Sequence, residues 1–176
     1  ELGFKYLSEK KFDKAISSYC RFLQRANDHR FEKNIDESFL HFIIALDLIF
    51  GLEGRSTSAV SSRAALLVHC QLKKNLKKQT KDVKRLYDIR SKYVHEGKRV
   101  SKKDLIELEE VCSQILWTLL VASGHNEIED ISEYLKQIDY VISALEANKE
   151  LPEEEFKKLG ISPDGQKYVP PNRVEA

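Results

Sequence analysis

The 176-residue sequence contains no methionine, only seven glycines and four prolines, and no apolar run long enough to cross a membrane. Three of the prolines follow residue 160, so most of the chain has few of the residues that break helices and form tight turns. This scarcity argues against a β-sandwich or barrel with many turns. The longest apolar stretch, 39–52, is interrupted by His41 and Asp47, which excludes a transmembrane helix and with it a membrane partner.

Cysteine is scarce too, since only Cys20, Cys70 and Cys112 are present, far apart in the sequence. That pattern excludes a disulfide framework and a zinc knuckle, and it predicts a cytoplasmic location. The histidines lack partners at metal-ligand spacing, and no phosphate-binding or dinucleotide-binding glycine motif is present, so we expect neither a metal nor a cofactor. The chain shows no signal peptide and does not begin with methionine, so we expect it to be a piece of a longer protein.

The apolar residues that are present recur at three- and four-residue steps, and no segment shows convincing alternation with a period of two. We therefore predict an all-α fold, an up-and-down helical bundle of five to six helices over residues 1–150. Residues 151–176 are expected to form a short helical turn followed by an extended tail that contains proline. The expected helices cover about residues 12–23, 35–50, 58–76, 80–96, 102–123 and 127–147.

Several helix ends have recognisable capping residues. Asn34, with Glu37 three residues later, is a good N-cap for the second helix, and Ser101 with Asp104 has the same spacing before a later one. Gly97 follows a helical stretch and is suited to the left-handed residue that closes a helix. These signals place a helix end directly after His95.

The net charge of +1 hides a strongly basic segment, residues 71–103, which has thirteen basic residues against three acids and so carries +10. The basic residues follow helical steps, which indicates a cationic face that would bind the phosphate backbone of RNA, with Tyr87 and Tyr93 placed to stack on bases. A solvated helix face is the alternative. The predicted RNA-binding residues are Lys73, Lys77, Lys81, Lys84, Arg85, Ser91, Lys92, Lys98 and Arg99.

Arg90 and His95 form an R-x4-H pair inside this segment. A guanidinium can grip a phosphate, and an imidazole can move the proton of a 2′-hydroxyl or a leaving 5′-oxygen, so the pair suits RNA cleavage. In a continuous helix the two side chains diverge by roughly 140°. They converge only if the helix frays or tightens before Gly97, or if two copies of the chain each supply half a site. The structural alternative is that Arg90 pairs with an acid and that His95 caps the helix C-terminus.

Asp47 interrupts the apolar second helix, and an isolated buried carboxylate is costly, so we expect it to have a cationic partner. Arg63 and Arg90 are the candidates. We favour a structural role, in which Asp47 forms an ion pair with Arg63 or simply faces solvent at the edge of its helix. The functional alternative is that Asp47 contacts Arg90 and orients it without touching the substrate.

Segments between Ser38 and Leu120 together resemble the HEPN superfamily, in particular its Apea-type members. These segments are FLHFIIALDLIFG, SSRAALLVHC, LYDIRSKYVHEGK and DLIELEEVCSQILWTLL, in this order. The resemblance implies a four-to-five-helix bundle whose R-x4-6-H motif forms a metal-independent ribonuclease site at a homodimer interface. It makes Arg90 and His95 the catalytic pair.

The same resemblance implies RNA as substrate and a role in toxin–antitoxin systems, antiviral defence or RNA processing. An antitoxin or a neighbouring regulatory domain is a further expected partner. Because many members of the superfamily are not catalytic, a non-catalytic HEPN-like module that binds RNA or a protein is the alternative. A purely structural helical scaffold is a third hypothesis.

Overall fold

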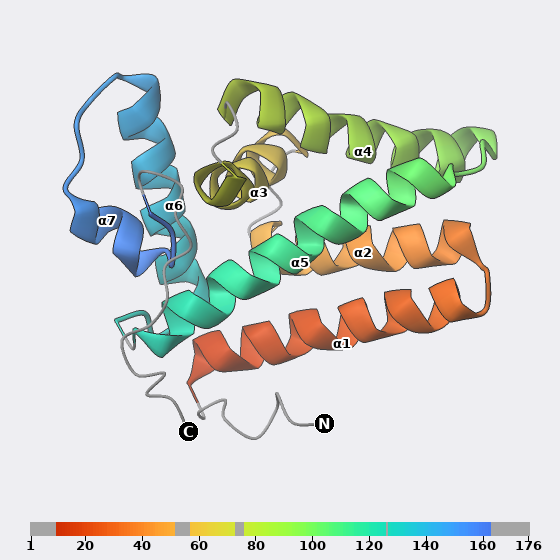
Figure 1. Cartoon of the computed structure of the whole chain (residues 1–176), viewed down its shortest axis with the longest axis horizontal. Coiled ribbons are helices and arrows are strands. Elements are labelled where there is room, and N and C mark those ends of the chain that lie inside the picture. The colour runs from red at the N-terminus through yellow and green to blue at the C-terminus, as the bar shows by residue number, and fades with distance from the viewer. Residues whose placement is uncertain (1–9, 52–56, 73–75, 126, 163–176) are drawn as a thin grey trace.

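The computed structural model describes residues 10–51, 57–72, 76–125 and 127–162, and over these residues the chain is an all-α bundle of seven helices without a strand (Figure 1). This confirms the predicted fold class. The helices are α1 (Lys11–Phe31), α2 (Ile35–Phe50), α3 (Thr57–Leu72), α4 (Leu76–Glu96), α5 (Lys102–Gly124), α6 (Ile131–Glu146) and α7 (Glu153–Lys158).

The predicted capping residues occupy the predicted places. The Asn34 side chain accepts a hydrogen bond from the Glu37 amide (3.4 Å) at the start of α2, and the Ser101 hydroxyl accepts one from the Asp104 amide (3.2 Å) before α5. Gly97 has a φ of +68° and its amide donates to the Tyr93 carbonyl (3.1 Å), which closes α4. The sequence therefore identifies the ends of these helices correctly.

Helix α4 begins at Leu76, four residues before the start predicted at Thr80. The Thr80 hydroxyl donates to the Leu76 carbonyl (2.9 Å), so this side chain bonds back inside the helix instead of capping it. Gln79 is buried, which places the first turn of α4 against the core. Packing of Leu76 and Gln79 thus extends the helix beyond what the capping pattern indicates.

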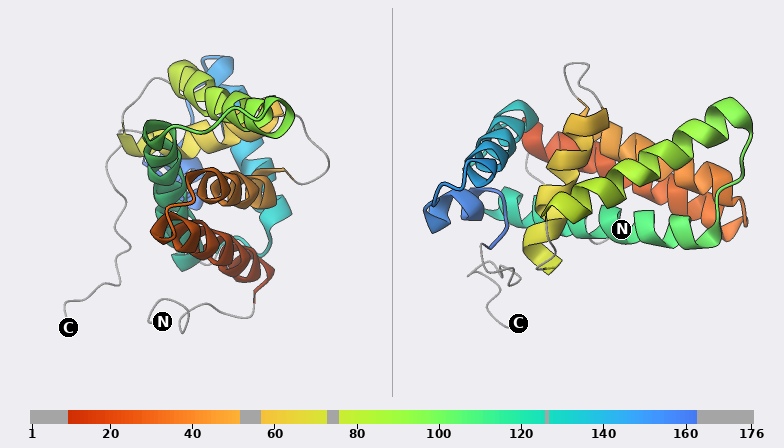
Figure 2. Two further views of the ribbon diagram at one scale, coloured as in Figure 1. Left: turned by 90° about the vertical axis from the view of Figure 1, so that its right-hand side faces the viewer. Right: turned by 90° about the horizontal axis from the view of Figure 1, so that it is seen from above.

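Helices α1, α2, α4 and α5 run along the long axis of the molecule, and α3 lies across them, nearly end-on in Figure 1 and lengthwise in the view from above in Figure 2. Helix α2 is the central helix, as its apolar sequence predicts, and it packs on α1, α3, α4 and α5. Its buried side chains form the middle of the core, namely Phe39, Phe42, Ile43, Ala45, Leu46, Ile49 and Phe50.

A buried arginine joins α3 to its neighbours. Arg63 is 2% exposed, and its guanidinium makes two hydrogen bonds to the Asp139 carboxylate of α6 (2.8 and 2.7 Å) and one to the Phe50 carbonyl at the end of α2 (2.7 Å). All three hydrogen bonds are charge-assisted, because the guanidinium that donates them is a cation. Their acceptors lie on α2 and α6, so Arg63 of α3 links three helices at one point.

The segment after α6 packs into the core. The predicted short helical turn is α7, and Phe156, Leu159 and Ile161 are buried. The buried Tyr134 hydroxyl of α6 donates to the Leu159 carbonyl (2.9 Å), which fixes the chain beyond α7. The extended tail predicted after this point lies outside the described residues.

We expect Gly160→Ala to lower the free energy of unfolding by at least about 2 kcal/mol. Gly160 has a φ of +72°, and a Cβ there would overlap the Thr118 carbonyl oxygen and lie 2.8 Å from the Ala122 nitrogen of α5. Gly97→Ala is the matched control, because Gly97 has nearly the same φ but nothing within 4 Å of its Cβ position, and it should cost only about 1 kcal/mol. Urea unfolding measures both, and equal losses would contradict the steric account.

The acidic C-terminal helices lie away from the last turns of α4. Those turns and the start of α5 lie at one end of the long axis, while α6 and α7, which carry six of the ten acids of residues 125–159, lie at the other (Figure 1). The described acidic helices therefore do not cover the last turns of α4. Within the described ranges, no helix has the length and apolar character that crossing a bilayer requires.

Candidate functional site on helix α4

Arg90 and His95 lie on a helix that stays regular to its end. Helix α4 continues to Glu96, and both side chains are exposed. Five residues of a regular helix turn through roughly 500°, so the two side chains point roughly 140° apart and are separated by about 7.5 Å along the axis. The helix does not fray or tighten before Gly97, so the two groups of one chain do not converge on one phosphate.

His95 shares a face of α4 with four of its exposed lysines. Its helical position lies within roughly 60° of theirs, so one stripe of positive charge runs along the helix to the imidazole. We call this face the lysine stripe, and it consists of Lys77, Lys81, Lys84 and Lys92 together with His95. The stripe ends at the C-terminus of α4.

Arg90 lies on the other side of the helix, the side that carries the buried Val83 and Leu86. Arg90 is nevertheless exposed, and Val94, one turn further on, is 50% exposed. This side of α4 therefore opens to solvent in its last two turns. Arg90 makes no hydrogen bond or ion pair with any residue that the structure describes, so the predicted structural alternative, an ion pair with an acid, is not found there.

Asp47 has a different partner from the two that the sequence suggested. Its Oδ1 accepts a hydrogen bond from the Tyr87 hydroxyl of α4 (2.8 Å), while Arg63 binds Asp139 instead. The predicted ion pair between Asp47 and Arg63 is therefore wrong, because the guanidinium binds the Asp139 carboxylate of α6 and the Phe50 carbonyl instead of the Asp47 carboxylate.

Tyr87 binds Asp47 and lies one helical turn before Arg90. Tyr87 is 7% exposed. Burial, followed by the Asp47 carboxylate, raises the pKa of its phenol well above the ordinary value, and the Arg90 cation has a smaller effect in the opposite direction. The predicted role of Tyr87 in stacking on bases is wrong, because the ring is buried, whereas Tyr93 is half-buried. The helical phase shared with Val83 could have indicated this burial.

The other predicted RNA-binding residues fall into three groups. Ser91, Lys98 and Arg99 are exposed beside the lysine stripe, with Lys98 paired to Glu96 (2.7 Å) and lowering the pKa of that carboxyl. Arg85 is exposed as well, but its guanidinium binds both Asp104 and Glu107 of α5 (2.6 Å each), so it is already neutralised. Lys73 lies outside the described residues.

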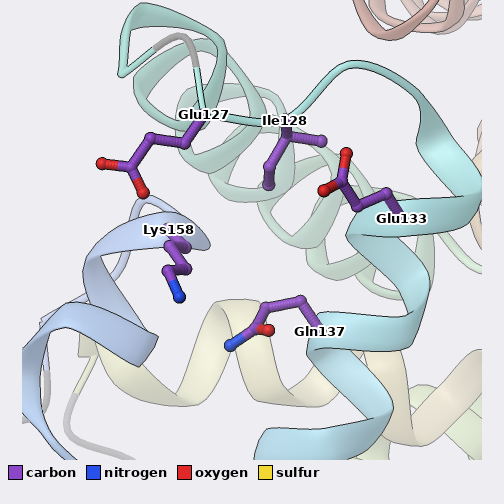
Figure 3. Close-up of a pocket in the computed structure, with 5 residues that line it drawn as sticks. All are labelled: Glu127, Ile128, Glu133, Gln137 and Lys158. Carbon is purple, nitrogen blue, oxygen red and sulfur yellow. The ribbon is translucent and has the colours of Figure 1, made fainter.

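Other parts of the described chain offer less chemistry. A shallow pocket of about 250 Å³ lies between α6, α7 and the segment before α6, lined by Glu127, Ile128, Glu133, Gln137 and Lys158 (Figure 3). Two of its polar side chains are already engaged, since Gln137 and Lys158 both bind Glu155 outside the lining (2.6 and 3.1 Å). Among the described residues, no group of three or more His, Cys, Asp or Glu side chains is arranged to hold a metal ion.

Two exposed apolar residues, which the sequence patterns did not single out, lie near Arg90. Val94 follows it on α4, and Ile44, which is 40% exposed, lies one turn before Asp47 on α2. Because α2 and α4 run in opposite directions (Figure 1), Ile44 and Arg90 lie on the same side of the Asp47–Tyr87 contact.

Comparisons of the chain with models of protein families, with curated proteins and with solved structures gave no match.

Proposed function

We propose that two copies of this chain form a metal-independent endoribonuclease of the HEPN type, in which Arg90 of one copy and His95 of the other act on the same phosphate. The observation that carries the proposal is the placement of these two residues on a regular helix. Both are exposed, and Arg90 has no partner among the described residues, yet they point roughly 140° apart. A site that uses both therefore needs two chains.

The helix surface between the two residues suits a symmetric contact. Ser91 and Val94 lie in the arc that separates Arg90 from His95. In an antiparallel pair of α4 helices around a two-fold axis, Ser91 faces Val94 of the partner subunit and Arg90 faces His95 of the partner subunit. The exposed Val94 and Ile44 supply apolar surface for such an interface.

The chemistry of the pair is that of transesterification within RNA. The 2′-oxygen attacks the adjacent phosphorus, the bond from phosphorus to the 5′-oxygen breaks, and the 2′ proton leaves through a base while the 5′-oxygen gains a proton. The imidazole of His95 is suited to one of these transfers. The guanidinium of Arg90 holds the phosphate oxygens and stabilises the charge that develops on them. The lysine stripe, which ends at His95, binds the phosphates that flank the cleaved one.

The test of this function is cleavage of single-stranded RNA by the purified chain in EDTA. We expect products with a 2′,3′-cyclic phosphate on one side of the cut and a 5′-hydroxyl on the other, because these ends follow from attack by the 2′-oxygen. Products with a 5′-phosphate, or cleavage that stops in EDTA, would contradict the proposal.

We expect Val94→Asp to convert a dimer into a monomer, because it buries two negative charges beside the two-fold axis of the proposed interface. Light scattering coupled to gel filtration measures the mass. Ile106→Asp on α5 is the matched control, since Ile106 is 48% exposed and lies on another helix. If Val94→Asp leaves the mass unchanged while the wild type is a dimer, the interface lies elsewhere.

The alternative function is a non-catalytic module that uses the lysine stripe to bind RNA. The stripe itself favours it, because its four lysines are exposed whether or not the chain cleaves. Binding of RNA by both the wild type and His95→Ala, with cleavage by neither, would support this alternative. An antitoxin or neighbouring domain that covers α4 would block either function. We expect the protein to carry out either function in the cytoplasm.

We expect Lys81→Gln to weaken RNA binding and to reduce the slope of log K against log salt by about 0.7, because one phosphate contact is lost. Lys136→Gln removes the same charge from an exposed position on another helix, α6, and should leave the slope unchanged. Titrations of a labelled RNA at several salt concentrations measure both. Equal slopes for the two variants would place RNA away from the stripe.

A further inference from the structure

We infer that Tyr87 is a positioning residue for Arg90: its hydroxyl holds the Asp47 carboxylate in place and so leaves the Arg90 guanidinium available to an anion. The inference rests on the proposed function only in taking that anion to be an RNA phosphate. The arrangement of the three side chains is a property of the folded chain.

The contact between Tyr87 and Asp47 is the first observation. The phenol is 7% exposed and its ring belongs to the core, so the hydroxyl has a fixed position. It donates to Oδ1 of Asp47 at 2.8 Å. Asp47 is only half-buried, so without this hydrogen bond its short side chain is free to take another rotamer.

The state of Arg90 is the second observation. Arg90 follows Tyr87 by three residues and therefore lies one turn along the same side of α4. It makes no hydrogen bond or ion pair with a described residue. Asp47 thus binds the Tyr87 hydroxyl, while the Arg90 guanidinium, one turn further along α4, is not paired with it.

Competition between two anions follows from this arrangement. A carboxylate that binds Arg90 occupies the same donors that a phosphate needs, because both ligands use the planar guanidinium in a bidentate manner. With the Tyr87 hydroxyl in place, the carboxylate is held at α2. Without it, Asp47 can turn toward Arg90 and compete with RNA for the guanidinium.

Three variants test the inference, with a labelled 20-nucleotide 2′-O-methyl RNA as a probe that cannot be cleaved by its own 2′-oxygens. Tyr87→Phe should bind it about two- to fivefold more weakly, the size expected when an ion pair near the surface competes. Asp47→Asn should bind it about as tightly as the wild type, because Tyr87 already keeps residue 47 away from Arg90 and the amide oxygen still accepts from Tyr87. In the double variant, loss of the hydroxyl should have no further effect on affinity.

The double variant separates positioning from a structural role, because it should regain the affinity that Tyr87→Phe loses, whereas damage to the fold from loss of the hydroxyl would persist in it. Tyr134→Phe is the matched control: it removes a buried tyrosine hydroxyl that donates to the Leu159 carbonyl, far from α4, and should leave RNA affinity unchanged. Weaker binding by Asp47→Asn, or unchanged binding by Tyr87→Phe when Arg90→Ala does weaken binding, would overturn the inference and leave the proposed function intact.

A second measurement does not depend on RNA. The side-chain Nε–Hε resonance of Arg90 in an NMR spectrum should sharpen and exchange more slowly with water in Tyr87→Phe, because the guanidinium gains an ion pair with Asp47. If Arg90→Ala does not weaken RNA binding, the role proposed for Arg90 in RNA binding fails, and this resonance alone decides the inference. An unchanged resonance in Tyr87→Phe would overturn it.

Discussion

Replacing Arg63 by alanine is expected to lower the free energy of unfolding by about 3–5 kcal/mol, the range found when one partner of a buried ion pair is removed. The Arg63 side chain is 2% exposed, and its loss removes two hydrogen bonds to the Asp139 carboxylate and one to the Phe50 carbonyl. It also leaves a cavity where α2, α3 and α6 meet. Thermal and urea unfolding of the purified variant measure the loss.

The control for this prediction is another arginine with two carboxylate partners. Arg85→Ala removes the pairs with Asp104 and Glu107, but Arg85 is 43% exposed, so we expect a cost of only about 1 kcal/mol or less. A loss for Arg63→Ala no larger than that for Arg85→Ala would show that the contact with α6 does not hold the bundle together.

Replacing His95 by alanine is expected to reduce the rate of RNA cleavage by about 10²–10⁴-fold, the contribution of a positioned general acid or base. RNA affinity should change little, because most of the proposed phosphate contacts are with the lysines of the stripe. The fold should persist as well, since His95 is exposed in the last turn of α4. Single-turnover cleavage and direct titration of RNA measure the rate and the affinity separately.

The control is Lys92→Ala, a neighbour on the same stripe. It removes a charge but no proton-transfer group, so it should weaken RNA binding and leave the cleavage rate at saturating RNA nearly unchanged. If His95→Ala cleaves as fast as Lys92→Ala once both are saturated, His95 takes no part in the chemistry.

Local sequence patterns were sufficient for the helices and for several of their ends. Asn34, Ser101 and Gly97 act within their own turns, so the spacing of neighbouring residues is enough to recognise them. The period of the apolar residues likewise identifies α2 as the central helix, because a helix that is apolar on most sides must be covered on most sides.

Partners between helices could not be predicted in this way. Asp47, Arg63 and Tyr87 lie on three helices, and the choice between Arg63 and Tyr87 as the partner of Asp47 depends on how α3 crosses the bundle. Arg85 is equivalent to its lysine neighbours in the sequence, yet two acids of α5 lie opposite it in the fold. Gly160 needs its positive φ because α5 lies against it, and no local pattern contains that contact.

The central claim is that the site combines Arg90 of one copy with His95 of another, and mixing two inactive variants tests it most directly. When Arg90→Ala and His95→Ala are refolded together in equal amounts, half of the dimers are mixed, and each mixed dimer has one intact site out of two. The account predicts recovery of about a quarter of the wild-type cleavage rate. A mixture no more active than the separate variants would contradict a site shared between two copies.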